Sequence, residues 1–412
     1  MKVKVSICIY LVIMSIPCLY FCANKTVHKN ENNEGLAYII NLTKAIYKPI
    51  NYSDVFERVD YVKLETKKEC LIDNYYLYLY LTDIYIIAFY FPTQSAYLFD
   101  RETGKFIKQI GSKGQGPNEY SLFTKTIFDE VSSILFFDRN KDWLGYHIET
   151  ENTSIIIPPI KLEKTVGDRT ITMSLIHNFV KIDSTAYAGY VNNYSGRDSI
   201  KLVIFDKDGN ILKTFPNYQS FGPNDEYNNK NQNSISFKPY NGDWYKYNGV
   251  YYFKEGIFND TIFRVTRDSM IPYISFLLGN KKPSYQFMGG SGSEMDDYYY
   301  VYIQGENDKY LFFNFSYKRN KYYCYFDKSK AETYVSNFLD DDGIAFFKND
   351  LDEIPIKTLG NLNSNGETLG RLSAEKILEA LKGKKTLSSK LQHLKNIEYD
   401  DNPIVVIAIP KK

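Results

Sequence analysis

Cysteine, histidine and tryptophan are scarce in this 412-residue chain, and this scarcity limits the kinds of site that it can form. The sequence contains five cysteines, four histidines and two tryptophans. The histidines are scattered without the spacing of zinc ligands, so we predict no metal site. Three cysteines fall within the first 22 residues, which leaves Cys70 and Cys324 in the rest of the chain. A disulfide between these two, or two free buried thiols, would explain the pair.

The chain also lacks an excess of either charge. Fifty Lys and Arg residues face forty-nine Asp and Glu residues, for a formal net charge of +1. This balance provides no field that would draw nucleic acid to the protein, so we predict no nucleic-acid partner. The sequence carries no motif that calls for a cofactor, and we predict none.

The first 22 residues have the pattern of an export signal. Lys2 and Lys4 precede an apolar run that ends at Cys22, as in the charged and apolar regions of a secretory signal. A cysteine at this position resembles the bacterial lipoprotein signal, although Phe21 is bulkier than the small residue normally found before that cysteine. We predict a lipoprotein-type signal peptide over 1–22 with lipidation at Cys22. A plain secretory signal or an uncleaved anchor is the alternative.

A polar segment follows the signal. Residues 23–36 lack core-forming side chains, which predicts a flexible tether that we extend over 23–50. No later stretch is long and apolar enough to cross a bilayer. We therefore expect an exported protein of the periplasm or outer membrane that is attached to the membrane through its N-terminal lipid.

Aromatic residues are abundant, and they occur in a repeated pattern. The chain has 38 Tyr and 27 Phe, which favour strands over helix interiors. In one stretch Asp100 precedes Gly116 by sixteen residues, and in another Asp206 precedes Gly222 by the same sixteen. Each glycine opens a Gly-Pro-Asn-Glu-Tyr segment, with Asp225 as the only insertion. Internal repetition of this kind is typical of repeat architectures.

A Phe-Asp step marks the proposed hairpins. It occurs at 99–100, 137–138, 205–206 and 326–327. A strand that ends at Asp can bond its side chain to backbone N–H groups of the following turn, after which a second strand returns. The steps at 99–100 and 137–138 lie 38 residues apart, near the length of a four-stranded propeller blade. The 106-residue offset between the two longer matches would span two or three blades, and the body has room for about six or seven.

The end of the chain departs from this pattern. Ser373 is a helix N-cap, and the apolar spacing predicts a helical segment over 373–395 with a break at Gly383. The unbroken apolar run 404–409 predicts a buried strand. Pairing of this strand with strands from the N-terminal end would close a ring and remove exposed sheet edges.

Four segments carry a resemblance to a known family. They are 62–72, 99–120, 258–273 and 401–405, and they include the Gly-Gln-Gly-Pro-Asn-Glu-Tyr and Asp-Asn-Pro motifs. Together they resemble the six-bladed β-propeller lipoproteins of Bacteroidetes, a group of domains of unknown function that is distantly similar to NHL-repeat propellers. The resemblance implies an all-β, six-bladed propeller over 51–412, with a short C-terminal helical segment, and it implies no particular activity.

The glycine-rich segment before the second blade offers the first candidate ligand contacts. Gly114, Gly116, Glu119 and Tyr120 belong to a run that invites comparison with a phosphate loop, but the Gly-Lys-Ser/Thr ending and the following helix are missing. We interpret the run as a turn between blades, fixed by Glu119 and Tyr120. In the usual blade order it would lie near one mouth of the central channel, where it could contact a ligand.

Trp244 is the remaining candidate contact. It stands in the run Tyr-Asn-Gly-Asp-Trp over 240–244, and aromatic faces with Asn and Asp neighbours can stack on sugars. Packing within a strand is the alternative that we favour.

Two functions fit these observations. The first is a non-catalytic binding or scaffold propeller of the cell envelope that presents its loops to a glycan, a peptide or an envelope protein. The second is a propeller lyase or hydrolase that acts on an extracellular glycan or peptide at the channel mouth, which rests on analogy of fold alone. No catalytic residue is identified by the sequence, because no nucleophile elbow or other catalytic constellation is present.

Overall fold

The computed structural model describes most of the chain after residue 34. The described ranges are 35–123, 125–139, 142–150, 154–166, 169–174, 176–191, 198–219, 242–256, 259–284, 296–352, 354–357, 360–382 and 388–411. Residues 154, 161–166, 169–174 and 177 are described by their backbone alone. The predicted signal peptide, Cys22 and the second Gly-Pro-Asn segment lie outside the described residues.

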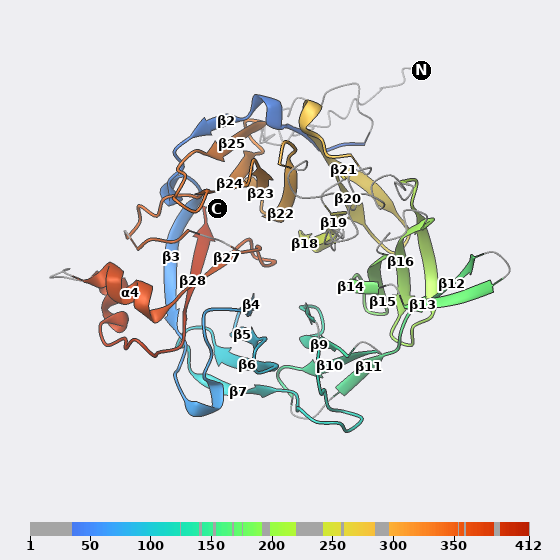
Figure 1. Cartoon of the computed structure of the whole chain (residues 1–412), viewed down its shortest axis with the longest axis horizontal. Coiled ribbons are helices and arrows are strands. Elements are labelled where there is room, and N and C mark those ends of the chain that lie inside the picture. Colours follow the sequence, from blue (N-terminus) through green and yellow to red (C-terminus); the bar gives the residue numbers. More distant parts are fainter. Residues whose placement is uncertain are drawn as a thin grey trace, which may run out of the picture. The chain divides into compact units, whose positions relative to one another are not determined.

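Each of the first five blades contains four antiparallel strands, and the blades are arranged about a common axis (Figure 1). Blade 1 consists of β4 (Leu77–Leu81), β5 (Tyr85–Tyr90), β6 (Ser95–Asp100) and β7 (Phe106–Ile110). Blade 2 consists of β8 (Thr126–Asp129), β9 (Ile134–Asp138), β10 (Trp143–His147) and β11 (Ser154–Ile157). Blade 3 consists of β14 (Ile176–Lys181), β15 (Ala186–Val191), β16 (Ile200–Asp206) and β17 (Ile211–Pro216). Blade 4 consists of β18 (Asp243–Tyr247), β19 (Val250–Lys254), β20 (Thr261–Val265) and β21 (Met270–Leu277). Blade 5 consists of β22 (Tyr300–Glu306), β23 (Tyr310–Tyr317), β24 (Asn320–Asp327) and β25 (Glu332–Ser336).

The sixth or closing blade is assembled from both ends of the chain. Strand β28 (Ile404–Pro410) pairs antiparallel with β27 (Thr368–Leu372) on one side and with the N-terminal β3 (Phe56–Lys63) on the other. An isolated antiparallel bridge between Leu362 and Thr368 adds a short hairpin on the other edge of β27. Figure 1 shows β3 beside β28. This arrangement confirms the predicted closing strand and its pairing with the N-terminal end.

The N-terminal segment contributes two further strands, so the predicted tether over 23–50 is too long. Strand β1 (Tyr38–Asn41) pairs parallel with β21, and β2 (Ile46–Lys48) pairs parallel with β25. The outermost strand of each blade presents unpaired backbone groups, and β1 and β2 satisfy those of blades 4 and 5. The two strands are short and directly follow the polar residues 23–36, but they are not polar themselves, and Ile40 of β1 is fully buried.

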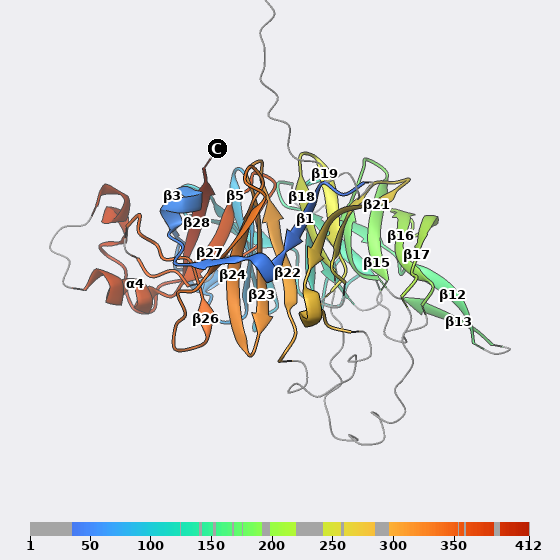
Figure 2. The same ribbon diagram turned by 90° about the horizontal axis from the view of Figure 1, so that it is seen from above.

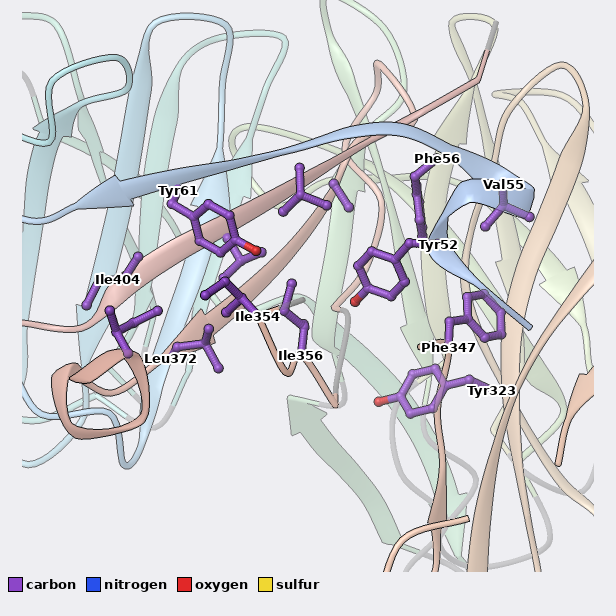
Figure 3. Packing of buried hydrophobic residues seen from close by; sticks show 14 of the residues in the cluster. Tyr52, Val55, Phe56, Tyr61, Tyr323, Phe347, Ile354, Ile356, Leu372 and Ile404 are labelled. Atoms are coloured by element: carbon purple, nitrogen blue, oxygen red, sulfur yellow. The ribbon is translucent and has the colours of Figure 1, made fainter. Parts of the chain in front are cut away.

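Six hydrophobic clusters hold the ring together, one at each interface between neighbouring blades in the described residues. The cluster between blade 5 and the closing blade joins the two ends of the chain. In it Tyr52 and Phe56 from the N-terminal end pack with Tyr323 of blade 5 and with Ile354 and Ile404 from the C-terminal end (Figure 3). All five side chains are buried, so closure rests on apolar packing as well as on strand pairing.

The Phe-Asp steps end strands as predicted. Asp100, Asp206 and Asp327 each end the third strand of a blade, and Asp206 Oδ1 accepts hydrogen bonds from the backbone N–H groups of residues 208 and 210 at 2.9 Å. The 106-residue offset therefore spans two blades. The interpretation of the 38-residue spacing as one blade is wrong, because Asp138 ends a second strand rather than a third.

Two insertions project from opposite sides of the ring (Figure 2). One is the predicted helical segment, in which α4 (Ala374–Leu381) is capped by the Ser373 side chain, and η5 (Ser389–Leu394) is a 3₁₀-helix. Its apolar side chains, Ile377, Leu391 and Leu394, are buried against the closing blade. The other is the two-stranded hairpin of β12 (Lys161–Val166) and β13 (Arg169–Ser174). The remaining short elements are η1 (Leu42–Lys44), α1 (Tyr52–Val55), η2 (Lys68–Cys70), η3 (Gly279–Lys281) and β26 (Ile344–Ala345).

Candidate functional site in the central channel

A pocket of about 600 Å³ lies against the innermost strands of blade 1 and the closing blade and reaches the end of β8 in blade 2. Its lining consists of Asn74, Tyr78, Leu79, Tyr80, Leu81, Phe128, Glu130, Gly360, Asn361, Leu362, Asn363, Leu369, Gly370, Arg371 and Lys376. The volume is within the range of roughly 300–1,000 Å³ that small-molecule sites occupy. Because three segments far apart in the sequence supply the lining, the pocket forms only when the ring closes.

Aromatic rings form one wall of this pocket, and each is held by a neighbour. The Tyr78 ring stacks on Phe89, with centroids 5.8 Å apart and an interplanar angle of 18°. Tyr80 donates its hydroxyl hydrogen to the backbone oxygen of Thr126 at 2.9 Å, and its ring lies 6.0 Å from that of Phe128. These contacts fix the rings before any ligand arrives, which lowers the entropic cost of binding.

Two cations lie on the side of the closing blade. Arg371 on β27 donates to the backbone oxygen of Leu77. Burial lowers the pKa of Arg371, and the nearby Tyr78 hydroxyl opposes this effect. Lys376 is exposed in the first turn of α4. A guanidinium and an ammonium group at one pocket are suited to bind a carboxylate or another anion.

Glu130 supplies the carboxylate of the pocket, and groups from three other blades surround it. Burial raises the pKa of Glu130, while a hydrogen bond to Ser364 and the charge of Lys246 oppose this effect. Asp83, which also raises this pKa, accepts a hydrogen bond from Asn365 Nδ2 at 2.5 Å. Turns of blades 1 and 2, strand β18 of blade 4 and the inner hairpin of the closing blade therefore converge around Glu130.

The sequence-predicted glycine-rich segment lies outside this pocket lining. It connects β7 to β8, which confirms the interpretation as a turn between blades. The Glu119 carboxylate accepts a hydrogen bond from the Gly116 N–H at 2.8 Å, and a Cβ atom on Gly114 would lie 1.9 Å from the same carboxylate. Tyr120 is fully buried, and its ring stacks on Phe137 at 4.7 Å. These contacts are internal to the protein, and a ligand contact by the segment stays a prediction.

Trp244 also lies apart from the pocket lining. It is half-buried on β18, and its ring packs on Phe253 with centroids 4.7 Å apart. A Cβ atom on Gly242 would collide with the same Phe253 ring. The contact agrees with the packing that we favoured for Trp244. Its Nε1 is buried and finds no hydrogen-bond partner in the described part of the chain.

The two cysteines of the body are free thiols. Cys70 and Cys324 are both buried, and burial raises the pKa of each thiol. The disulfide alternative is therefore wrong. In the described ranges no three His, Cys, Asp or Glu side chains converge in a way that could hold a metal ion, and none of the helices there is both long and apolar enough to span a membrane.

Six blades about one axis, with the last built from both ends of the chain, define the protein as a six-bladed β-propeller. The chain belongs to the DUF4934 family, a domain of unknown function, whose model matches residues 37–408. No curated protein matches the chain.

Two solved Bacteroides structures are similar to this chain. A protein of Bacteroides fragilis that is inferred to be exported has a TM-score of 0.66 at 19% sequence identity, covering 91% of this chain and 100% of its own. A DUF4221 family member from Bacteroides vulgatus has a TM-score of 0.48 at 12% identity, covering 87% of this chain and 97% of its own. The first likeness supports the propeller fold.

Proposed function

We propose that this protein is a non-catalytic binding propeller of the cell envelope and that the channel pocket holds its ligand. The observation that carries the proposal is the mixed lining of the pocket. Fixed aromatic rings stand beside the amides of Asn74 and Asn361, the cations Arg371 and Lys376, and the carboxylate of Glu130. Sites for small ligands typically combine such apolar walls with a few polar groups that orient the ligand.

The composition of the lining favours binding over hydrolysis. Among the described residues that form it, Glu130 is the one carboxylate, and none is Ser, Thr, Cys or His. Most glycosidases use two carboxylates across the scissile bond, and peptide hydrolysis needs a nucleophile or a metal. A lyase or hydrolase remains the alternative, and it would release altered products from a bound glycan or peptide.

Arrays of glycans and peptides, probed with the purified full chain in detergent, test the proposal. We expect a defined set of ligands to bind, and we expect Asn361→Ala and Lys376→Ala to weaken that binding. Lys395→Ala is the matched control, because Lys395 is also an exposed lysine of the helical insertion but does not line the pocket. A blank on both arrays, or binding that the pocket variants leave unchanged, would refute the pocket. Chromatography of the bound ligand should show it intact, and cleavage would refute the non-catalytic assignment.

The proposed envelope location rests on the N-terminal signal and is supported by the exported relative from Bacteroides fragilis. Metabolic labelling with a fatty acid tests the anchor. We expect label on the wild type and on Cys18→Ser, and no label on Cys22→Ser. If Cys22→Ser and the wild type carry the same amount of label, the lipid is attached at another residue. If neither protein carries label, the lipid anchor is refuted.

A further inference from the structure

Three exposed tyrosines stand beside the channel pocket. Tyr75, Tyr76 and Tyr78 are 74%, 68% and 56% exposed. Tyr75 and Tyr76 directly precede β4, and Tyr78 is its second residue. Asn74 and Tyr78 belong to the pocket lining. We call Tyr75, Tyr76 and Tyr78 the tyrosine rim. A cluster of exposed aromatic side chains usually marks a site that binds a ligand or a partner.

The backbone of the rim is fixed although its rings are exposed. The N–H of Tyr75 donates to Asp73 Oδ1 at 3.0 Å, and the backbone oxygen of Tyr76 accepts from Phe91 N at 3.2 Å. Tyr76 has φ of 54°, in the left-handed region that a bulky side chain rarely adopts. This backbone conformation is energetically unfavourable for tyrosine, and it is kept only where contacts with the surrounding structure enforce it. The rings are therefore presented to solvent by an ordered segment.

The polar groups next to the rim indicate the chemistry of the ligand. Asn74 Oδ1 is buried without a hydrogen-bond partner in the described residues, and Asn361 is exposed. An amide can donate to one sugar hydroxyl and accept from another. Arg371 and Lys376 add positive charge on the same side, and a carboxylate satisfies both a guanidinium and an ammonium group.

We propose that the tyrosine rim and the pocket together bind an acidic oligosaccharide, that is, a glycan containing uronic acid. Sugar rings stack on the tyrosines, a uronate carboxylate pairs with Arg371 and Lys376, and hydroxyl groups bond to the amide of Asn74. This inference rests on the proposed binding function and names the ligand class of the same site. It assigns stacking to Tyr75 and Tyr76, which lie outside the pocket itself.

Calorimetric titration of the full chain with short uronate oligomers tests the inference. The panel contains oligomers of galacturonate, glucuronate, mannuronate and guluronate, each with its neutral counterpart of equal length. We expect at least one acidic oligomer to bind and its neutral counterpart to bind at least tenfold more weakly. Tyr76→Ala should weaken binding about 3- to 10-fold, the range expected for one stacked ring. Lys376→Ala should weaken it and reduce its dependence on salt concentration.

Matched variants separate the rim from a general effect of the substitution. Tyr399 is 70% exposed but does not line the pocket, so Tyr399→Ala should bind like the wild type, as should Lys395→Ala. Equal affinity for acidic and neutral oligomers would overturn the inference, and so would wild-type binding by Tyr76→Ala. Binding of a peptide or a nucleotide in place of uronates, weakened by Asn361→Ala, would overturn the inference and leave the proposed pocket intact. If no uronate oligomer, peptide or nucleotide binds, both the inference and the proposed binding pocket are overturned.

Discussion

Asn402 is the polar side chain that ties the start of the closing strand to the loop before blade 1. It is fully buried. Its Oδ1 accepts from the backbone N–H of Ile72 at 2.9 Å, and its Nδ2 donates to the backbone oxygens of Glu65 and Cys70 at 2.8 and 2.9 Å. All three partners lie more than 300 positions away in the sequence. The Asp-Asn-Pro motif at 401–403 therefore has a structural role in ring closure.

Asn402→Ala should lower the free energy of unfolding by about 3 kcal/mol. Each of the three hydrogen bonds contributes about 1 kcal/mol net. Their removal leaves the N–H of Ile72 and the backbone oxygen of Cys70 unpaired in a buried place, whereas the backbone oxygen of Glu65 still accepts from the Cys70 thiol. The neighbouring ion pair between Lys63 and Asp401, at 2.6 Å, stays in the variant and does not replace these bonds. The loss is large because all three bonds join the start of the closing strand to the loop before blade 1.

Urea unfolding followed by intrinsic fluorescence and by circular dichroism measures this loss. Asn361→Ala is the control, because Asn361 is exposed, and exposed substitutions usually change stability by less than about 0.5 kcal/mol. A loss below about 1 kcal/mol for Asn402→Ala, or a loss equal to that of the control, would refute the assignment of ring closure to this side chain. Limited proteolysis should also cleave the variant faster within residues 64–76 than it cleaves the wild type.

Two further predictions concern carboxylates near the blade turns. Gly114→Ala should displace the Glu119 side chain from the Gly116 N–H and lower the free energy of unfolding by about 1 kcal/mol. Glu119→Ala removes the same hydrogen bond. In urea unfolding the double variant should therefore be no less stable than the less stable single variant. Burial raises the pKa of Glu130 above its ordinary value of 4.5, so the folded state holds this proton more tightly than the unfolded chain, and stability should fall as the pH rises from the ordinary value through the raised one. Glu130→Gln should lack this fall in a series of melting temperatures from pH 4 to 7, and parallel curves for the two proteins would contradict the assignment.

The sequence predicted secondary structure correctly where a residue type has a single structural role. Each Phe-Asp step combines a buried ring with a side chain that bonds the following turn, so the hairpins ending at Asp100, Asp206 and Asp327 could be predicted. The closing strand at 404–409 was equally clear from its apolar run. The spacing between steps was less informative, because a step can end the second or the third strand of a blade. The parallel strands β1 and β2 were not predicted because they are short and directly follow a polar segment, although Ile40 of β1 packs in the cluster between blades 4 and 5.

The pocket could not be predicted for a different reason. Tyr78, Glu130 and Arg371 come from three segments far apart in the sequence, and no local motif connects them. Their proximity follows from the strand order of the closing blade, in which β27 pairs with β28 and β28 pairs with β3. Because β27 carries Arg371 and also depends on this pairing, we expect binding of a ligand at the proposed site to be coupled to ring closure. A ligand that bridges Arg371 and Glu130 joins the closing blade to blade 2, so it should stabilise the closed ring by linkage.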